Sequence, residues 1–163
     1  MSVYSTIIDA IATDLTTNVT TLATANTNNQ LAVHKYTPLT IERMQKDGFR
    51  HLAVWLAPDQ PAVLNNQQPQ TGIHNHSARF EVAYWEPSPE GEKGVADETA
   101  ATTILTLNDA FLTRFYQTTF QTVGSSAGQW RMWFESMTPL IGGDHPVRAL
   151  VYTLVGNVEY QFS

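Results

Sequence analysis

The chain has 163 residues, of which 42% are hydrophobic and 15% are charged, and its formal net charge is −6. This length and composition predict one globular domain over residues 1–163, and the negative charge argues against general affinity for DNA or anionic membranes, which are bound through Lys and Arg. The chain has no cysteine, which excludes disulfides, thiolate metal sites and thiol catalysis.

The first part of the chain predicts helices and strands in alternation. Apolar residues at helical spacing indicate a helix over residues 3–25, and its Thr- and Asn-rich end is expected to fray or turn between residues 18 and 29. Alternating apolar and polar residues predict a short strand at 31–36 and a longer one at 49–57. A Thr-Pro start and a glycine stop predict a short helix at 38–47 between these strands.

Residues 58–75 are predicted to form a long loop, because they are rich in Pro, Asn and Gln and show no sustained periodicity. Loops longer than about 12–15 residues in compact domains are usually functional or disordered, so this loop is a candidate for contact with a partner. Its glutamines Gln67, Gln68 and Gln70 are candidate interface residues. Clear alternation then predicts a second long strand at 76–86.

A central helix is predicted over residues 97–121, with one apolar side. Asn108 projects from the middle of that side, either as a hydrogen-bonded core amide or as an intersubunit contact. Two strands are predicted after the helix, at 129–137 and 147–162. Gly156 and Asn157 mark a candidate bulge or turn in the second of them.

The order of these elements predicts an α+β fold. Hairpin-like strand pairs on either side of the central helix indicate a mainly antiparallel sheet. The two long helices each have an apolar side to bury, so we expect both to pack on one face of that sheet.

The opposite sheet face is predicted to carry three tryptophans, which ordinary solvent faces seldom do. Trp55, Trp85 and Trp133 fall on the less apolar side of their strands, together with Arg79 and Arg131. Because Trp and Arg are enriched where surfaces bind other proteins, these residues are candidates for a subunit or partner interface. The alternatives are a register error of one residue, tryptophans covered by a loop of the same chain, or a carbohydrate platform.

Acidic residues gather at the turn before the central helix and at its start: Glu86, Glu90, Glu92, Asp97 and Glu98. One interpretation is a solvated turn that complements the helix dipole. The other is an anionic surface that faces a basic partner or lines a path for DNA, which makes these residues candidates for a lumen-facing or acidic partner surface.

Sequence motifs that would carry catalysis are missing. The chain contains no Gly-x-Ser-x-Gly elbow, no Walker loop and no Gly-x-Gly-x-x-Gly turn after a strand. His74 and His76 alternate beside the long loop, and His145 would add a third imidazole, but no spacing ties the three together as a metal site. We therefore predict no enzyme activity, no cofactor and no metal.

With these segments placed, the chain resembles phage tail terminators, the minor tail proteins that cap the head-proximal end of a tail tube. The resemblance lies in the order of the elements and in three local features. These are the amphipathic N-terminal helix before Leu-Ala-Val-His-Lys-Tyr at 31–36, the hairpin at 49–86 with its Pro/Gln loop, and the central helix followed by two strands, with Val-Arg-Ala-Leu-Val-Tyr-Thr-Leu-Val at 147–155. Together these features cover nearly the whole chain.

The resemblance implies a structural virion protein of the tail or neck, without catalytic residues. It implies a hexameric ring, assembled in the host cytoplasm, that terminates the tail tube, contacts the tail tube protein and joins the head connector or stopper, while DNA passes through without specific binding. Head-tail adaptors, stoppers and tail completion proteins fit the same description. A carbohydrate- or peptide-binding module that uses exposed Trp is the alternative of another class. No apolar run approaches the about 20 residues of a membrane span, so no membrane partner is expected.

Overall fold

The computed structural model describes the backbone of residues 3–38, 49–57, 63–64, 73–87, 95–117, 121–122, 129–140 and 147–161. Side chains are described for residues 4–38, 49–57, 78–86, 98–99 and 101–114. The short helix predicted at 38–47 falls, except for its first residue, outside these ranges.

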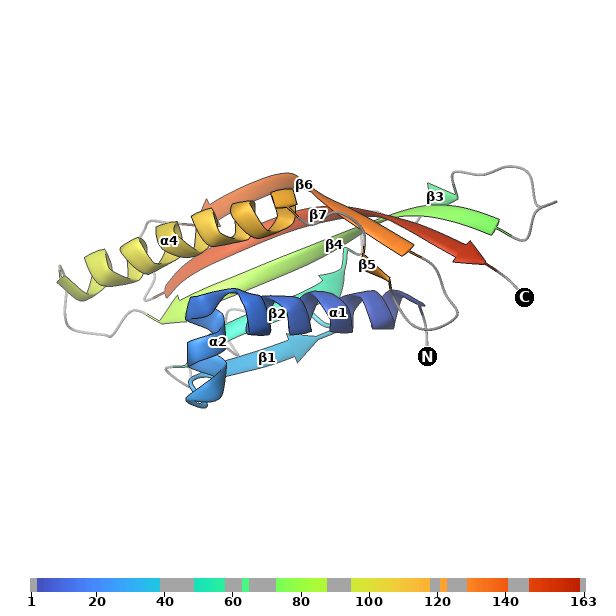
Figure 1. Ribbon diagram of the computed structural model, residues 1–163. Helices are drawn as coiled ribbons and strands as arrows, with labels where there is room; N and C mark the ends of the chain where they lie inside the picture. Colours follow the sequence, from blue (N-terminus) through green and yellow to red (C-terminus); the bar gives the residue numbers. More distant parts are fainter. Residues whose placement is uncertain are drawn as a thin grey trace.

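The described part of the chain contains three helices and seven strands (Figure 1). The helices are α1 (Val3–Asn18), α2 (Thr20–Thr27) and α4 (Val95–Gln117). The strands are β1 (Leu31–Lys35), β2 (Arg50–Leu56), β3 (Val63–Leu64), β4 (Ile73–Pro87), β5 (Gln121–Thr122), β6 (Gln129–Leu140) and β7 (Val147–Gln161).

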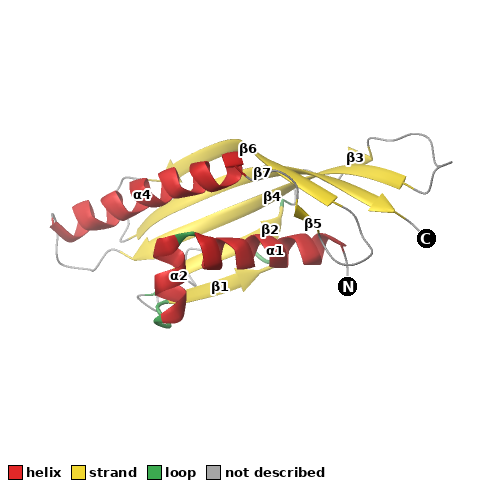
Figure 2. Ribbon diagram, in the orientation of Figure 1, coloured by secondary structure: helices red, strands yellow, loops and turns green. Residues whose placement is uncertain are grey.

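All of the described strands belong to one sheet. Its order is β1-β2-β4-β7-β6-β5, and β3 pairs with the N-terminal part of β4. β1 runs parallel to β2, whereas the other described pairs are antiparallel. Helices and sheet form two layers (Figure 2). The predicted α+β class is therefore confirmed, with a sheet that is mainly antiparallel.

The pairing of β4 with β7 joins the two halves of the chain. The ladder runs from Ile73 opposite Gln161 to Pro87 opposite Val147, along the full length of both strands. β2 lies on the other side of β4, and β6 lies on the other side of β7. The two predicted strand pairs on either side of the central helix are thus merged into one sheet.

One irregularity in the sheet differs from the prediction. The register of β6 against β7 shifts between Phe134 and Ser136, which leaves Glu135 as an extra residue. The predicted bulge or turn at Gly156 and Asn157 is wrong, because both residues continue a regular ladder with the two neighbouring strands. A single extra residue bends a strand locally and increases its twist, and the pattern of apolar residues does not reveal which of two paired strands carries it.

Two long helices cover one face of the sheet. α1 contacts β1 and β2, α4 contacts β4, β6 and β7, and α2 leaves the end of α1 at a steep angle and leads to β1 (Figure 1). The layers meet through a core contributed by alternate residues of β2 and β4 and by the apolar sides of the helices. Its largest fully buried side chains are Tyr84, Phe80, Phe111, Ile7, Ile11, Leu15, Leu22, Leu52, Ile104 and Leu107.

The N-terminal helix predicted over residues 3–25 is split into two. At Val19 the backbone is extended, with φ −91° and ψ 105°, so the chain turns inside the segment that was expected to fray or turn. Beyond the break the chain is again helical, as far as Thr27. Leu22 and Ala25 are fully buried there, and this burial offsets the low helix propensity of the surrounding Thr and Asn.

Other element boundaries are also shifted. The predicted loop 58–75 contains β3, and its last three residues belong to β4. α4 begins two residues before the predicted helix 97–121 and ends at Gln117. Strand pairing with distant segments causes the first difference, because β4 extends as far as β7 offers it partners.

A two-point ion pair joins α4 to α1. Arg114 Nε donates to Asp14 Oδ2 at 2.8 Å, and Arg114 Nη2 donates to Oδ1 of the same carboxylate. Asn18 Nδ2 also donates to Oδ1, at 2.8 Å. The hydrogen bond to Asp14 raises the pKa of the Arg114 guanidinium. Bidentate geometry constrains both direction and distance, so this pair sets how the two helices sit beside each other.

A second polar contact ties α1 to the end of β1. Lys35 Nζ lies 3.0 Å from Asp9 Oδ1, and the Tyr36 hydroxyl donates to the same oxygen at 2.8 Å. The hydrogen bonds from Lys35 and Tyr36 hold the pKa of Asp9 below its usual range. Tyr36 has a left-handed φ of 73°, which costs a non-glycine residue energy, and its backbone N–H donates to the Val54 carbonyl at 2.9 Å.

Two leucines on opposite sides of α4 test the packing of the helix layer. Leu107 is fully buried, whereas Leu105 is 54% exposed. We expect Leu107→Ala to lower the free energy of unfolding by about 2–5 kcal/mol, because it leaves a cavity, and Leu105→Ala to lower it by about 0.5 kcal/mol or less. Urea unfolding measures both. If both variants lost the same free energy of unfolding, Leu107 would not lie on the side of α4 that packs on the sheet.

Replacing Asp9 tests the contact between α1 and β1. A lowered folded-state pKa gives stability that is present above the ordinary value of about 3.9 and is lost as the pH falls through the folded value. Asp9→Asn should therefore cost up to about 1 kcal/mol at neutral pH, as for exposed ion pairs, and nothing in strong acid. Urea unfolding across pH measures this, with Asp109→Asn as the exposed control. An equal cost at every pH would contradict it.

Candidate functional site

The sheet face opposite α1 and α4, called the far face below, is built from neighbouring residues of three strands. Register aligns His51 with Trp85, Ala53 with Ala83, Trp55 with Glu81, and His34 with Ala53. Residues aligned across a ladder point to the same side of a sheet. The described far face therefore consists of Ala32, His34, His51, Ala53, Trp55, Arg79, Glu81, Ala83 and Trp85.

The two described tryptophans of the far face are buried. Trp55 and Trp85 are each 7% exposed, so the prediction of exposed tryptophans is wrong for these two residues. Ala53, Trp55 and Ala83 form an apolar cluster, in which the small alanines leave room for the indole ring. Among the described residues the Trp85 Nε1–H has no acceptor, and a buried unpaired donor costs about 1–3 kcal/mol. The far face thus carries a small apolar cluster among polar side chains, and its role as an interface stays a prediction.

The remaining interface candidates are only partly described. Register aligns Trp133 with Val155, and Val155 with Arg79, so Trp133 and Arg79 occupy equivalent positions on either side of β7. Arg79 is partly exposed. The side chains of Trp133 and Arg131 fall outside the described side chains. Gln67, Gln68 and Gln70 lie outside the described residues altogether.

Two histidine rings meet at the edge of the far face. His34 Nε2 lies 3.0 Å from His51 Nδ1, the ring centres are 5.3 Å apart, and the ring planes are inclined by 22°. The distance between the centres exceeds the N···N distance by about two ring radii. The rings therefore lie edge to edge along the line of an N–H···N hydrogen bond, not face to face. His51 is only 2% exposed.

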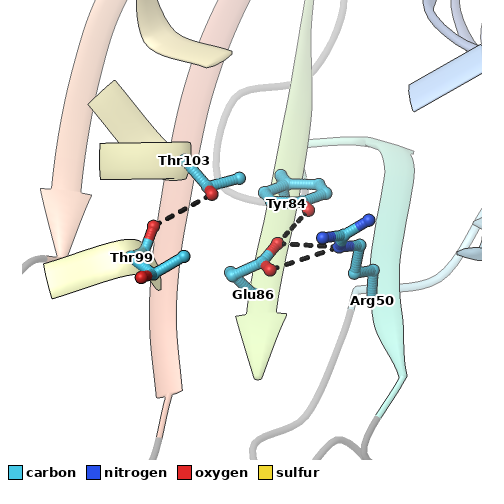
Figure 3. A network of polar contacts seen from close by, with 5 residues as sticks. All are labelled: Arg50, Tyr84, Glu86, Thr99 and Thr103. Carbon is cyan, nitrogen blue, oxygen red and sulfur yellow. Dashed lines mark hydrogen bonds and ion pairs between the residues drawn. The ribbon is translucent and has the colours of Figure 1, made fainter. Parts of the chain in front are cut away.

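Glu86, one of the predicted acidic-surface residues, is buried. Arg50 Nε donates to its two carboxylate oxygens at 3.2 and 3.1 Å, and the Tyr84 hydroxyl donates to Oε2 (Figure 3). The exposure expected of Glu86 is wrong, because it lies two residues after Tyr84 and alternation puts it on the helix-covered face. That face therefore holds a carboxylate with its cation beside it.

This polar network sits at the margin of the core. Figure 3 shows Tyr84 and Glu86 between Arg50 of β2 and the first turns of α4, where Thr99 and Thr103 lie. Burial, with added repulsion from the Glu86 charge, raises the pKa of the Tyr84 hydroxyl, so it stays protonated and remains a donor. The network neutralises the charge of Glu86 at the end of β4 and joins β4 to β2. We therefore interpret it as a contact that stabilises the fold.

The other predicted acidic-surface residues are only partly described. Glu98 is exposed, as that prediction requires. The backbone of Asp97 belongs to the first turn of α4, and its side chain falls outside the described side chains. Glu90 and Glu92 lie outside the described residues. The lumen-facing role of these residues stays a prediction.

Several residues of these sites were not identified from sequence. Arg50 and Tyr84 belong to predicted strands, but only the pairing of β2 with β4 brings Arg50 to Glu86. His34 stands in a short strand whose parallel partner is not visible in local pattern. Asn108 is partly exposed and has an interaction partner. Alternation alone would have indicated that Glu86 follows Tyr84 onto the helix-covered face.

Metal sites and membrane spans were sought in the described part of the chain. No group of three or more His, Cys, Asp or Glu side chains that could hold a metal ion occurs there. The backbone of His74 and His76 belongs to β4, but their side chains and all of His145 fall outside the described parts. None of the described helices has both the length and the apolar character needed to cross a membrane.

The chain is similar in structure to known proteins, although its sequence matches no family. No protein-family model and no curated protein matches the chain. A chain from the virion of a native gene transfer agent (GTA) particle is 16% identical, with 78% of each chain covered and a TM-score of 0.41. At that TM-score the likeness carries no argument about the function of this chain.

The Glu86 network can be tested by removing only the charge of its carboxylate. We expect Glu86→Gln to lower the free energy of unfolding by about 1–3 kcal/mol, because Arg50 and the Tyr84 hydroxyl lose a buried charged partner. The same exchange at exposed Glu98 should change it by less than about 0.5 kcal/mol. Urea unfolding at neutral pH compares the two variants. Similar small effects would mean that Glu86 is solvated.

Proposed function

We propose that this chain is a structural virion protein, without enzyme activity, that forms a homo-oligomeric ring in the tail or neck of a phage. The observation that supports this best is the order of elements within one sheet. An N-terminal helix is followed by the β2–β4 hairpin, the central helix α4 and the β6–β7 hairpin, and both long helices lie on one face. This is the order on which the sequence resemblance to tail terminators is based.

In this proposal the ring is a hexamer that ends the tail tube and joins it to the head connector. Each subunit of a ring meets its neighbours head to tail, so it needs two different contact surfaces. An open sheet has two unlike edges, and in the described strands these are β1 and β5. The helix layer and the far face likewise differ in chemistry. Such a subunit is suited to heterologous contacts.

The proposed subunit contacts involve the far face and the long loop. Their residues are Arg79, Arg131, Trp133, Gln67, Gln68 and Gln70. In this proposal Trp55 and Trp85 do not contact the neighbouring subunit directly, because each is only 7% exposed. Their packed rings instead support the surface residues that make the contact. A preorganised surface loses less conformational entropy when it binds, which favours assembly.

The lumen of the proposed ring must let DNA pass. The net charge of −6 suits this, since acidic walls repel phosphates over a distance of about 10 Å at 0.1 M salt. Arg50 neutralises Glu86. The proposed lumen surface is therefore reduced to Glu90, Glu92, Asp97 and Glu98.

Other roles in the neck remain alternatives within the same class. The described features suit head-tail adaptors, stoppers and tail completion proteins equally. A carbohydrate-binding module is less well supported, because stacking on sugars requires exposed aromatic faces and two of the three candidate tryptophans are buried.

Measurement of the assembly state tests the proposal. Native mass spectrometry should show a ring, and Arg131→Glu should shift it towards single subunits, because an acidic group then replaces an interface cation. Asp109→Lys is the matched charge reversal on the exposed side of α4 and should leave the ring intact. Circular dichroism should be unchanged in both variants.

The outcome also distinguishes the roles. A strictly monomeric wild-type protein that is absent from purified tails would overturn the virion proposal. Tail tubes of uncontrolled length in its absence would identify termination. Tubes of normal length that fail to join heads would instead identify an adaptor, stopper or completion role.

A further inference from the structure

The edge strand β1 is fastened to β2 by a side-chain contact in addition to its backbone ladder. His34 of β1 and His51 of β2 share the 3.0 Å N···N contact described above. β1 is the outermost strand on its side of the described sheet. The backbone of such an edge strand is paired on one side only, so the side-chain bond to β2 adds to that ladder and to the contact of Lys35 and Tyr36 with Asp9 of α1.

The chemistry of this contact depends on protonation. One proton lies between the two nitrogens, and whichever ring donates it, the other must offer a lone pair. One further proton can be taken up at a nitrogen outside the contact. When both rings are fully protonated, no lone pair remains for the bond, and two cations are forced together.

We propose that the His34–His51 pair is an acid-sensitive latch, which releases β1 from β2 when both rings are protonated. Free histidines take up protons as the pH falls through about 6.5. The closed pair resists the last proton because it would lose its hydrogen bond and bury a charge at His51, which is 2% exposed. The ratio of open to closed molecules therefore rises by up to about tenfold for each pH unit below about 6.5.

The surroundings of the latch set its pH window. On the same face, the described charged side chains are Glu81 and Arg79 of β4. Glu81 is aligned with Trp55, and Arg79 lies next to Ala57, so both are farther along β2 than His51. On the other face, α1 presents Asp9, which is engaged by Lys35 and Tyr36. α2 contains no titratable residue. Asp9 titrates only in stronger acid, so of the described charged and titratable side chains named here, only the two histidines change protonation between about pH 7.5 and 5.5.

Opening of the latch has a structural consequence. Release of β1 uncovers the edge of β2, whose backbone N–H and C=O groups can pair with a strand from another chain. Acid would therefore control whether the edge of β2 is covered by β1 or exposed for pairing with a strand of another chain. The inference concerns the edge of the subunit and does not depend on the proposed ring.

Hydrogen exchange of the β1 amides tests the latch in the full-length protein. After correction for intrinsic exchange, their opening constant should rise about tenfold between pH 7.5 and 5.5. In His34→Gln the rise should be less than about twofold, because a glutamine amide can still bond to His51 but cannot be protonated. His74→Gln removes a histidine elsewhere and should behave like wild type.

Two results would overturn the latch. One is an opening constant in wild type that does not change with pH, and the other is a His34→Gln variant with the wild-type pH response. Should His34→Gln fail to fold, NMR of ¹⁵N-histidine-labelled wild type decides instead. A coupling between the two ring nitrogens should be present at pH 7.5 and lost in acid together with β1 protection, and a coupling that persists when β1 opens would overturn the proposal.

Discussion

Alternation along the ladder between β4 and β7 is the constraint on which the other features of the subunit depend. Each residue of β4 is paired with one of β7, so a slip of one residue would exchange the two faces along the centre of the sheet. The observed register keeps Phe80, Val82 and Tyr84 under the helices and assigns Trp85 to the far face. Because β2 pairs with β4, its own faces follow from the same register.

Polar side chains occur where this apolar framework ends. Glu86 lies at the end of β4 and is neutralised by Arg50, and the histidine pair lies at the edge formed by β1. Both contacts place hydrogen-bonding groups in poorly hydrated positions, where an unmatched partner would be costly. Their chemistry differs, since the first contact joins opposite charges and the second joins two imidazoles, which change protonation near neutral pH.

These features bear on assembly in complementary ways. The Arg114–Asp14 pair joins the two long helices into one layer. The far face buries Trp55 and Trp85 and so forms a firm base for any contact made above it. A ring built from such subunits would rely on the surface around the tryptophans more than on the tryptophans themselves, because buried rings add stiffness and little contact area.

The sequence by itself determined the α+β class, the main helices and strands and which side of β2 and β4 faces the core, because these follow from local periodicity. It could not determine the break at Val19, the extra residue at Glu135 or the full extent of β4, which depend on packing and pairing with distant segments. Tertiary structure alone brought Arg50 to Glu86 and His34 to His51. It also buried two tryptophans whose pattern indicated exposure, since alternation assigns a side chain to a face and does not reveal what covers that face.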